Sequence, residues 1–235
     1  MATAFVQGTS NNSASSPWTT NAITTTSGNA LAASVAIYNG GGNVLNSFAD
    51  NKANIWTQVA NSPVSTGINN AQIAVFTASN ITGGAGHTFT ATNSNAYDGG
   101  TILIAELSGC STVNLVRATA NFGLQPGAQS HAGATVAAGA GDIVLAFSTD
   151  DNRASDAFTA GAGFTTGASI TAAAPTGFMM YAANVSAGNI TGAYTTTAFA
   201  ACGQIIVALI APSAFVSGQD VGLTGGLLEL SGGLS

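Results

Sequence analysis

Charged side chains are scarce in this chain. They make up 5% of its 235 residues, against about 25% in an ordinary globular domain. Only Lys52, Arg117 and Arg153 are positive, and the formal net charge is −6. Proteins that bind nucleic acid neutralise phosphates with several lysines or arginines, so the composition excludes nucleic acid as an expected partner. It excludes a polybasic membrane attachment for the same reason.

Long hydrophobic runs are also missing. The longest, residues 205–211, is far shorter than the roughly 20 apolar residues that a membrane-spanning helix needs. Residues 1–5 contain no basic region followed by an apolar stretch, so no secretory signal is expected. The sequence therefore predicts no membrane partner.

Cysteine is nearly absent as well, since Cys110 and Cys202 are the only two. Each lies beside one of two corresponding predicted strands, so a disulfide is geometrically conceivable if those strands are antiparallel neighbours. Two free, buried cysteines are the ordinary state in a protein made in a reducing compartment, and this is the state that we expect.

Apolar residues, in contrast, are plentiful. They make up 46% of the chain, and its mean hydropathy is +0.36. Disordered chains have little apolar content and a high net charge, so this composition favours a folded protein. A chain of this length can bury most of the surface that it exposes when unfolded.

Several segments recur after about 100 residues. The matched pairs are residues 28–35 with 141–146, 55–57 with 163–166, 73–82 with 178–186, and 100–105 with 203–208. A repeat this long exceeds a solenoid unit, so it predicts two related sets of strands that share or abut cores.

Alternating or short apolar runs, bounded by Gly, Asn, Ser or Pro, indicate β-strands, and helix signals are almost absent. We expect about fifteen short strands, with residues 114–118 and 130–135 in separate strands, and likewise 192–196 and 204–210. The predicted fold is all-β, a jelly-roll-like antiparallel β-sandwich with an internal duplication. Its halves are residues 1–112 and 113–211, followed by an extended Gly/Leu-rich tail, residues 212–235.

Uncharged strand faces are a second expectation. Residues 88–92, Thr-Phe-Thr-Ala-Thr, alternate a hydroxyl with an apolar or small residue, so one face meets a core and the other meets water or another subunit. Such a face can pack closely in an assembly because no ion has to be desolvated there. Alternatively, threonine is present only because it forms strands well.

The C-terminal tail is the predicted partner-binding segment. It cannot form a helix of useful length, and if it were free it would expose its apolar side chains. It therefore docks on a neighbouring chain as an added strand or folds back on its own sandwich, with disorder as the third alternative. The proposed contact residues are Phe215, Val216, Leu223, Leu227, Leu228, Leu230 and Leu234.

One acidic loop is a weak candidate for calcium binding. Asp150, Asp151 and Asp156 concentrate carboxylates, which are the ligands that calcium prefers, but the Gly and distal Glu of an EF-hand are not in place. The favoured interpretation is an acidic turn whose side chains cap their own backbone, with Arg153 offsetting the charge. No metal or other cofactor is expected.

Asp50, Asn54 and Trp56 form a candidate glycan site. An aromatic face stacks on the apolar face of a sugar ring, and carboxylate and amide groups bind its hydroxyls. The favoured interpretation is structural, however: Asp50 and Asn54 close a turn, and Trp56 enters the sandwich core.

No pattern indicates an enzyme. Glu106 lies in an apolar strand, where we expect a structural carboxylate, and no second carboxylate is placed for acid–base chemistry. The nearest cation in sequence is Arg117. His87 and His131 lack a Cys or His two to four residues away, and no Gly-x-Ser-x-Gly elbow leads into a helix.

Four segments carry a resemblance to known proteins: Gly28-Asn29, the turn from Asp50 to Trp56, residues 78–82, and residues 105–109 (Ala-Glu-Leu-Ser-Gly). With them, residues 1–211 resemble β-sandwich proteins of bacteriophage particles and of bacterial surfaces. The resemblance implies a non-enzymatic structural protein of a virion, such as a capsid decoration or another surface component, that forms a homo-oligomer and binds other virion proteins. The alternative that it implies is a glycan-binding or adhesion module.

Overall fold

The computed structural model describes residues 2–38, 44–65, 71–95, 99–150, 156–171 and 175–212, and in this range it leaves out the side chains of residues 124–128 and 198–200. Every regular element in these ranges is a β-strand, and every strand pair is antiparallel. The predicted all-β, sandwich-like class is therefore confirmed. The described part of the chain contains no helix able to cross a membrane.

Residues of the first half form three sheets. The first central sheet has the order β1 (Ala4–Ser13), β11 (Gly100–Ser108), β4 (Ala30–Tyr38), β8 (Ala71–Ala78), β6 (Thr57–Gln58), and β7 (Val64–Ser65) also pairs with β8. An outer sheet has the order β2 (Trp18–Thr19), β10 (Phe89–Asn93), β5 (Leu45–Asp50). A two-stranded ribbon joins β3 (Ile23–Thr25) and β9 (Gly84–His87).

The second half repeats this order of pairing. The second central sheet runs β12 (Val116–His131), β19 (Tyr194–Leu209), β14 (Ile143–Asp150), β17 (Gly177–Ala182), β16 (Thr165–Ile170), and β15 (Phe158–Ala160) pairs with β19. A ribbon joins β13 (Thr135–Ala138) and β18 (Gly188–Thr191). In each central sheet, the strand that begins with the repeated segment lies third in the order.

Two strands are longer than the sequence predicts. Residues 116–131 form one strand, β12, and residues 194–209 form another, β19, where two shorter strands were expected in each case. Three of the register shifts between β12 and β19 fall between Phe122 and Ser130, so the pair absorbs irregular residues without separating. Pro126 is tolerated there because β12 is an edge strand, where a missing N–H need not break a ladder.

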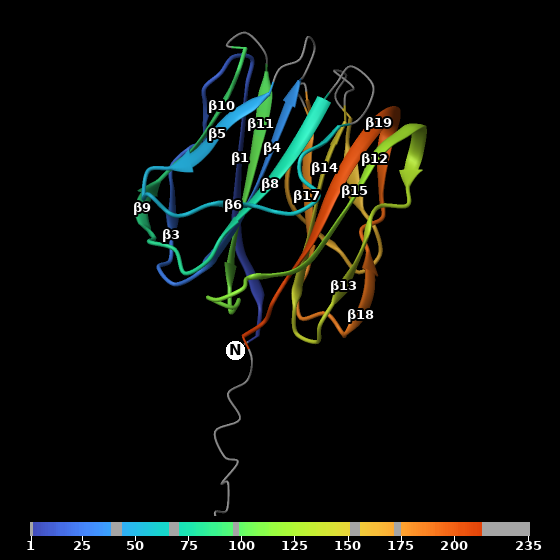
Figure 1. The fold of residues 1–235 in the computed structure, drawn as a ribbon. Coiled ribbons are helices and arrows are strands. Elements are labelled where there is room, and N and C mark those ends of the chain that lie inside the picture. Colours follow the sequence, from blue (N-terminus) through green and yellow to red (C-terminus); the bar gives the residue numbers. More distant parts are fainter. Residues whose placement is uncertain are drawn as a thin grey trace, which may run out of the picture.

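The two central sheets face each other across a shared core (Figure 1). Ala32, Val75 and Leu103 from the first sheet pack in one cluster with Leu145 and Val207 from the second. The opposite face of each central sheet is also covered. One packs on the outer sheet around Trp18 and Phe89, and the other packs on β13, β18 and the first residues of β19. Because both faces of these strands are buried, their sequences are continuous apolar runs.

Corresponding turns begin the third strand of each central sheet. Gly28 has a φ of 87° and Gly141 a φ of 82°, values that favour glycine. Gly28 N donates to Ile81 O, and Ile81 N donates to Asn29 O. In the second half, Gly141 N donates to Val185 O, and Val185 N donates to Asp142 O. Asn29 and Asp142 therefore hold matched positions, and so do Ile81 and Val185.

Candidate functional site

The acidic side chains of the described part are all buried, namely those of Asp50, Glu106, Asp142, Asp150 and Asp156. A buried carboxylate requires hydrogen bonds or a positive partner. Their partners therefore decide whether these residues form a reactive site or support the fold.

Asp50 closes the turn after β5. Its Oδ1 accepts hydrogen bonds from the backbone N–H groups of Lys52 at 2.8 Å and Asn54 at 3.1 Å. Its Oδ2 accepts from Asn54 Nδ2 at 3.0 Å and Trp56 Nε1 at 2.9 Å. Burial alone would raise the pKa of Asp50, but these hydrogen bonds favour the ionised form, and the pKa lies below its usual value.

Asn54 and Trp56 are also engaged within the protein. Asn54 Oδ1 accepts from Thr82 N at 2.7 Å, and Asn54 Nδ2 donates to Thr82 O at 3.1 Å. Trp56 is half-buried and packs edge-on against Phe48, with ring centroids 4.7 Å apart. The structure brings the three candidate glycan residues together, and their contacts fit the favoured structural interpretation.

The sequence did not indicate that His87 lies beside Asp50. Its Nε2 lies 3.4 Å from Asp50 Oδ2, and its Nδ1 lies 2.7 Å from Thr25 Oγ1. A carboxylate, an imidazole and a hydroxyl linked in this order resemble a catalytic triad. His87 and Thr25 are buried, however, with 0% and 3% of their surfaces exposed, so a substrate cannot reach the hydroxyl.

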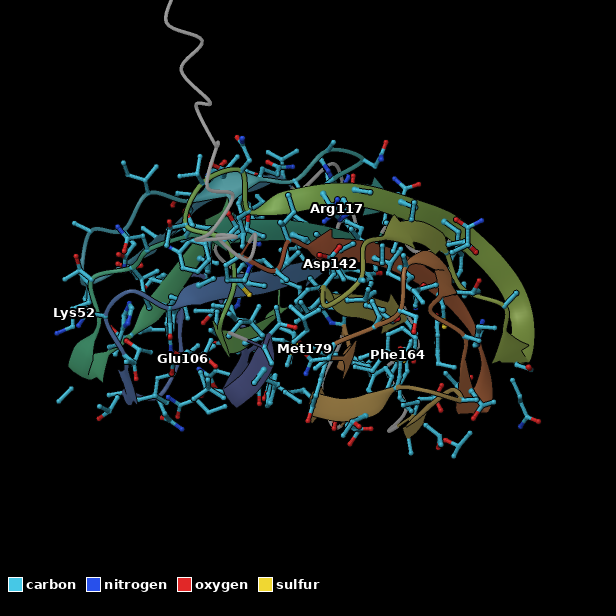
Figure 2. The ribbon with its side chains drawn as sticks, turned by 90° about the horizontal axis from the view of Figure 1, so that it is seen from below. Lys52, Glu106, Arg117, Asp142, Phe164 and Met179 are labelled. Carbon is cyan, nitrogen blue, oxygen red and sulfur yellow. The ribbon has the colours of Figure 1, made fainter. Side chains whose placement is uncertain are left out.

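Glu106 holds the turn before β4. Its Oε1 accepts from Thr26 N and Asn29 Nδ2, both at 2.7 Å, and its Oε2 accepts from Gln7 Nε2 at 2.5 Å. Arg117, the nearest cation in sequence, pairs with Asp142 instead, and Figure 2 shows Glu106 apart from both. The expected role as a structural carboxylate therefore agrees with its contacts.

Asp142 lies in the matched turn of the second half, at the position of Asn29. It accepts from Arg117 Nε and Nη2 at 2.5 and 3.2 Å, and from the N–H groups of Gly139 at 2.7 Å and Ala211 at 3.1 Å. The last contact fixes the chain just after β19. Thr3 Oγ1 donates to the neighbouring Gly141 O at 2.7 Å, so both ends of the described fold are attached to one turn.

The calcium candidates are only partly covered by the structure. Asp151 lies outside the described residues, while Asp150 and Asp156 are both fully buried. Asp156 Oδ1 accepts from Thr197 N at 2.7 Å and Thr197 Oγ1 at 2.6 Å, which is a capping role. Within the described ranges, no group of three or more His, Cys, Asp or Glu side chains could hold a metal ion.

Both cysteines are free, as expected. Cys202 Sγ lies 3.6 Å from His131 Nε2, but both residues are buried, with 0% and 1% of their surfaces exposed. Burial lowers the pKa of His131, which disfavours its charged form, while the charge of Asp156 acts in the opposite direction. Burial raises the pKa of Cys110 to about 12, and Asp142 adds to this. Neither thiol is prepared for nucleophilic chemistry.

Two uncharged grooves lie on the described part of the molecule. One, of about 410 Å³, lies between β5 and the facing parts of β4 and β8. The other, of about 480 Å³, is lined by the residues just before β16, including Phe164, by the end of β17 and the residues after it, and by β18. None of the described residues that line either groove is ionisable, so these grooves fit binding of an uncharged group better than acid–base chemistry.

The predicted partner-binding residues, Phe215, Val216, Leu223, Leu227, Leu228, Leu230 and Leu234, lie outside the described residues. Comparison of the chain with models of known families, with characterised proteins and with solved structures found no match.

Proposed function

We propose that this chain is a non-enzymatic structural protein that binds neighbouring subunits, and that it is a capsid decoration or other surface component of a phage particle. The observation that carries the proposal is the nearly ion-free surface. All five described acids are buried, so Lys52 and Arg117 are the only Asp, Glu, Lys or Arg side chains of the described part that reach solvent. Another subunit can cover such a surface without removing an ion from water.

The outer strands support the proposal in both halves. Exposed hydroxyls pair across neighbouring strands: Thr19 with Thr90 at 2.9 Å, Ser47 with Thr92 at 2.6 Å, and Thr135 with Thr191 at 2.7 Å. Each hydroxyl already has one partner, so another subunit can cover these faces without leaving a buried polar group unsatisfied.

We also propose that the fold is a duplicated, jelly-roll-like unit with a partner-binding tail. The repeated order of pairing and the matched turns at Gly28 and Gly141 support the duplication. The shared core joins the halves into one scaffold. Asp142 fixes Ala211 at the end of β19, which gives the tail from Ser213 a defined origin.

The test places one charge on an outer face. Thr90 lies in the middle strand of the outer sheet, and we expect Thr90→Lys to reduce the oligomeric mass measured by size-exclusion chromatography with light scattering. Thr24→Lys is the control, since Thr24 is an exposed strand threonine outside that sheet. An unchanged mass in Thr90→Lys, or a wild-type chain that is monomeric at every concentration, would count against the assembly role.

The location in a virion needs its own test. An antibody raised against the purified chain should label the surface of phage particles from the source material in negative-stain electron microscopy. Absence of the chain from purified particles would exclude the virion role, even if the purified chain forms oligomers.

A further inference from the structure

The groove between β5 and β8 combines an apolar floor with a polar rim. Val35, Ile37, Ala74 and Phe76 come from the first central sheet, and Leu45 and Phe48 come from β5. Val44, half of whose surface is exposed, lies at the same groove. Asn46, Gln58 and Gln72 supply amide groups, which can donate to and accept from a peptide backbone.

One side of the groove is an edge strand. In the outer sheet, β5 pairs with β10 and stands last in the order, so among the described strands it has one neighbour only. An edge strand presents a row of backbone N–H and C=O groups on which an extended peptide can add as a further strand. Side chains at alternate positions of that peptide would then enter the groove.

In the second half, an aromatic pair occupies the position matched to Ala74. Ala78 and Ala182 hold matched positions in β8 and β17. Ala74 and Phe178 each lie four residues earlier, so they are matched as well. Phe178 stacks on Phe158 with ring centroids 5.0 Å apart. Small Ala74 therefore leaves open a space that an aromatic pair fills in the other half.

The sequence of residues 213–235 fits this groove chemically. Leu228 and Leu230 are two positions apart and flank Glu229, so an added strand would place both leucines on one face and the carboxylate on the other. Asp220 and Glu229 are the only charged residues in the segment. An apolar, alternating segment suits a groove lined by apolar and amide side chains.

The segment is also long enough. The chain leaves the described fold at Pro212, beside the Asp142 turn that corresponds to the start of β4, whereas the groove lies over the later residues of β4. Residues 213–235 span up to about 75 Å when extended, which exceeds the length of a nine-residue strand, about 30 Å, and permits docking on the same or a neighbouring copy.

We propose that residues 213–235 dock as an added strand on the free edge of β5, with Leu228 and Leu230 in the β5–β8 groove. This inference deepens the proposed function, because docking on a second copy would link subunits of the assembly.

Hydrogen–deuterium exchange of the full chain tests the docking. In the wild type, we expect slow exchange in residues 44–50 and 223–231. The double variant Leu228→Asp/Leu230→Asp should speed exchange in both segments by at least about tenfold, which corresponds to about 1.4 kcal/mol of local stability. Ser231→Asp/Ser235→Asp adds the same charge on the opposite face of the added strand, the face of Glu229, and should retain slow exchange.

A second variant tests the groove from its other side. Ala74→Phe introduces the aromatic residue that Phe178 supplies in the second half, and it should release the tail while the exchange of β14 stays slow. Equal exchange of residues 44–50 in the wild type and in Leu228→Asp/Leu230→Asp would overturn the inference, whatever the outcome with Ala74→Phe.

The concentration dependence separates this inference from the proposed function. If protection of residues 44–50 disappears on dilution together with the oligomeric mass, the segment docks on a second copy. If protection persists in a monomer, the docking site stands, but the tail no longer supports a role in assembly.

Discussion

The two halves share an order of strands but fill their matched corners with different side chains. Trp56 and Phe164 precede Thr57 and Thr165, which pair with matched positions of β8 and β17. In the first half, Trp56 and Asn54 tie the corner to Asp50 and Thr82. In the second half, Phe164 has no hydrogen-bonding group, and a groove of about 480 Å³ lies beside it.

At a second pair of matched positions, Ala74 and Phe178, the first half is open and the second half is filled. The first half leaves the β5–β8 groove open over Ala74, whereas the second half closes the same position with Phe178. Each half therefore has one filled site and one open site, at non-equivalent places. Side chains at a few positions, rather than the strand order, decide where the described surface is grooved.

The largest expected effect comes from opening the filled site of the second half. Phe178→Ala removes a fully buried ring and its stack on Phe158, and should lower the free energy of unfolding by about 3–5 kcal/mol, measured by urea denaturation. Phe164→Ala is the control, because Phe164 is only partly buried and should cost less. Equal losses in the two variants would contradict the distinction between filled and open sites.

The same comparison marks how much the sequence could predict. Short apolar runs bounded by turn residues identified the all-β class, and the recurrence of Gly28 and Gly141 identified turns that have the same backbone hydrogen bonds. These features depend on local sequence, so a single chain reveals them. The structural role of Asp50 could also be predicted, since Asn54 follows it by four positions and the turn is local.

Contacts between distant residues could not be predicted in this way. His87 is 37 residues from Asp50, and no local pattern connects them. Arg117 is nearer to Glu106 in sequence but pairs with Asp142, because β12 and the turn before β14 meet only in the folded sheet. The continuity of β12 was missed because Pro and Gly predict a break, while an edge strand with register shifts accommodates them.

A smaller effect should follow from making the first corner resemble the second. Trp56→Phe removes the hydrogen bond to Asp50 Oδ2 and should lower the free energy of unfolding by about 1.5–3 kcal/mol, since the acceptor is a buried carboxylate. The control is the same substitution in an Asp50→Asn background, where much less should be lost. An equal loss in both backgrounds would show that ring volume, and not the hydrogen bond, accounts for the effect.

The smallest expected effect is a change in how the stability of the second half depends on pH. Burial acts to raise the pKa of Asp142, but hydrogen bonds from Arg117, Gly139 N and Ala211 N outweigh it and lower the pKa below its usual value. Since the unfolded chain takes up the proton first, near pH 4, this carboxylate stabilises the fold above that pH, and its contribution is lost as pH falls through the lower pKa of the folded state.

Asp142→Asn should therefore cost about 1–2 kcal/mol at pH 7, and the difference from the wild type should shrink as the pH falls below about 4 in urea denaturation. Arg117→Lys, which keeps a positive charge beside Asp142, is the control and should preserve the pH dependence of the wild type. Asp50 also has a lowered pKa, so the Asp142→Asn variant keeps the acid sensitivity of the first half. If the difference in stability between the variant and the wild type stays constant below about pH 4, Asp142 acts through packing alone and not through its charge.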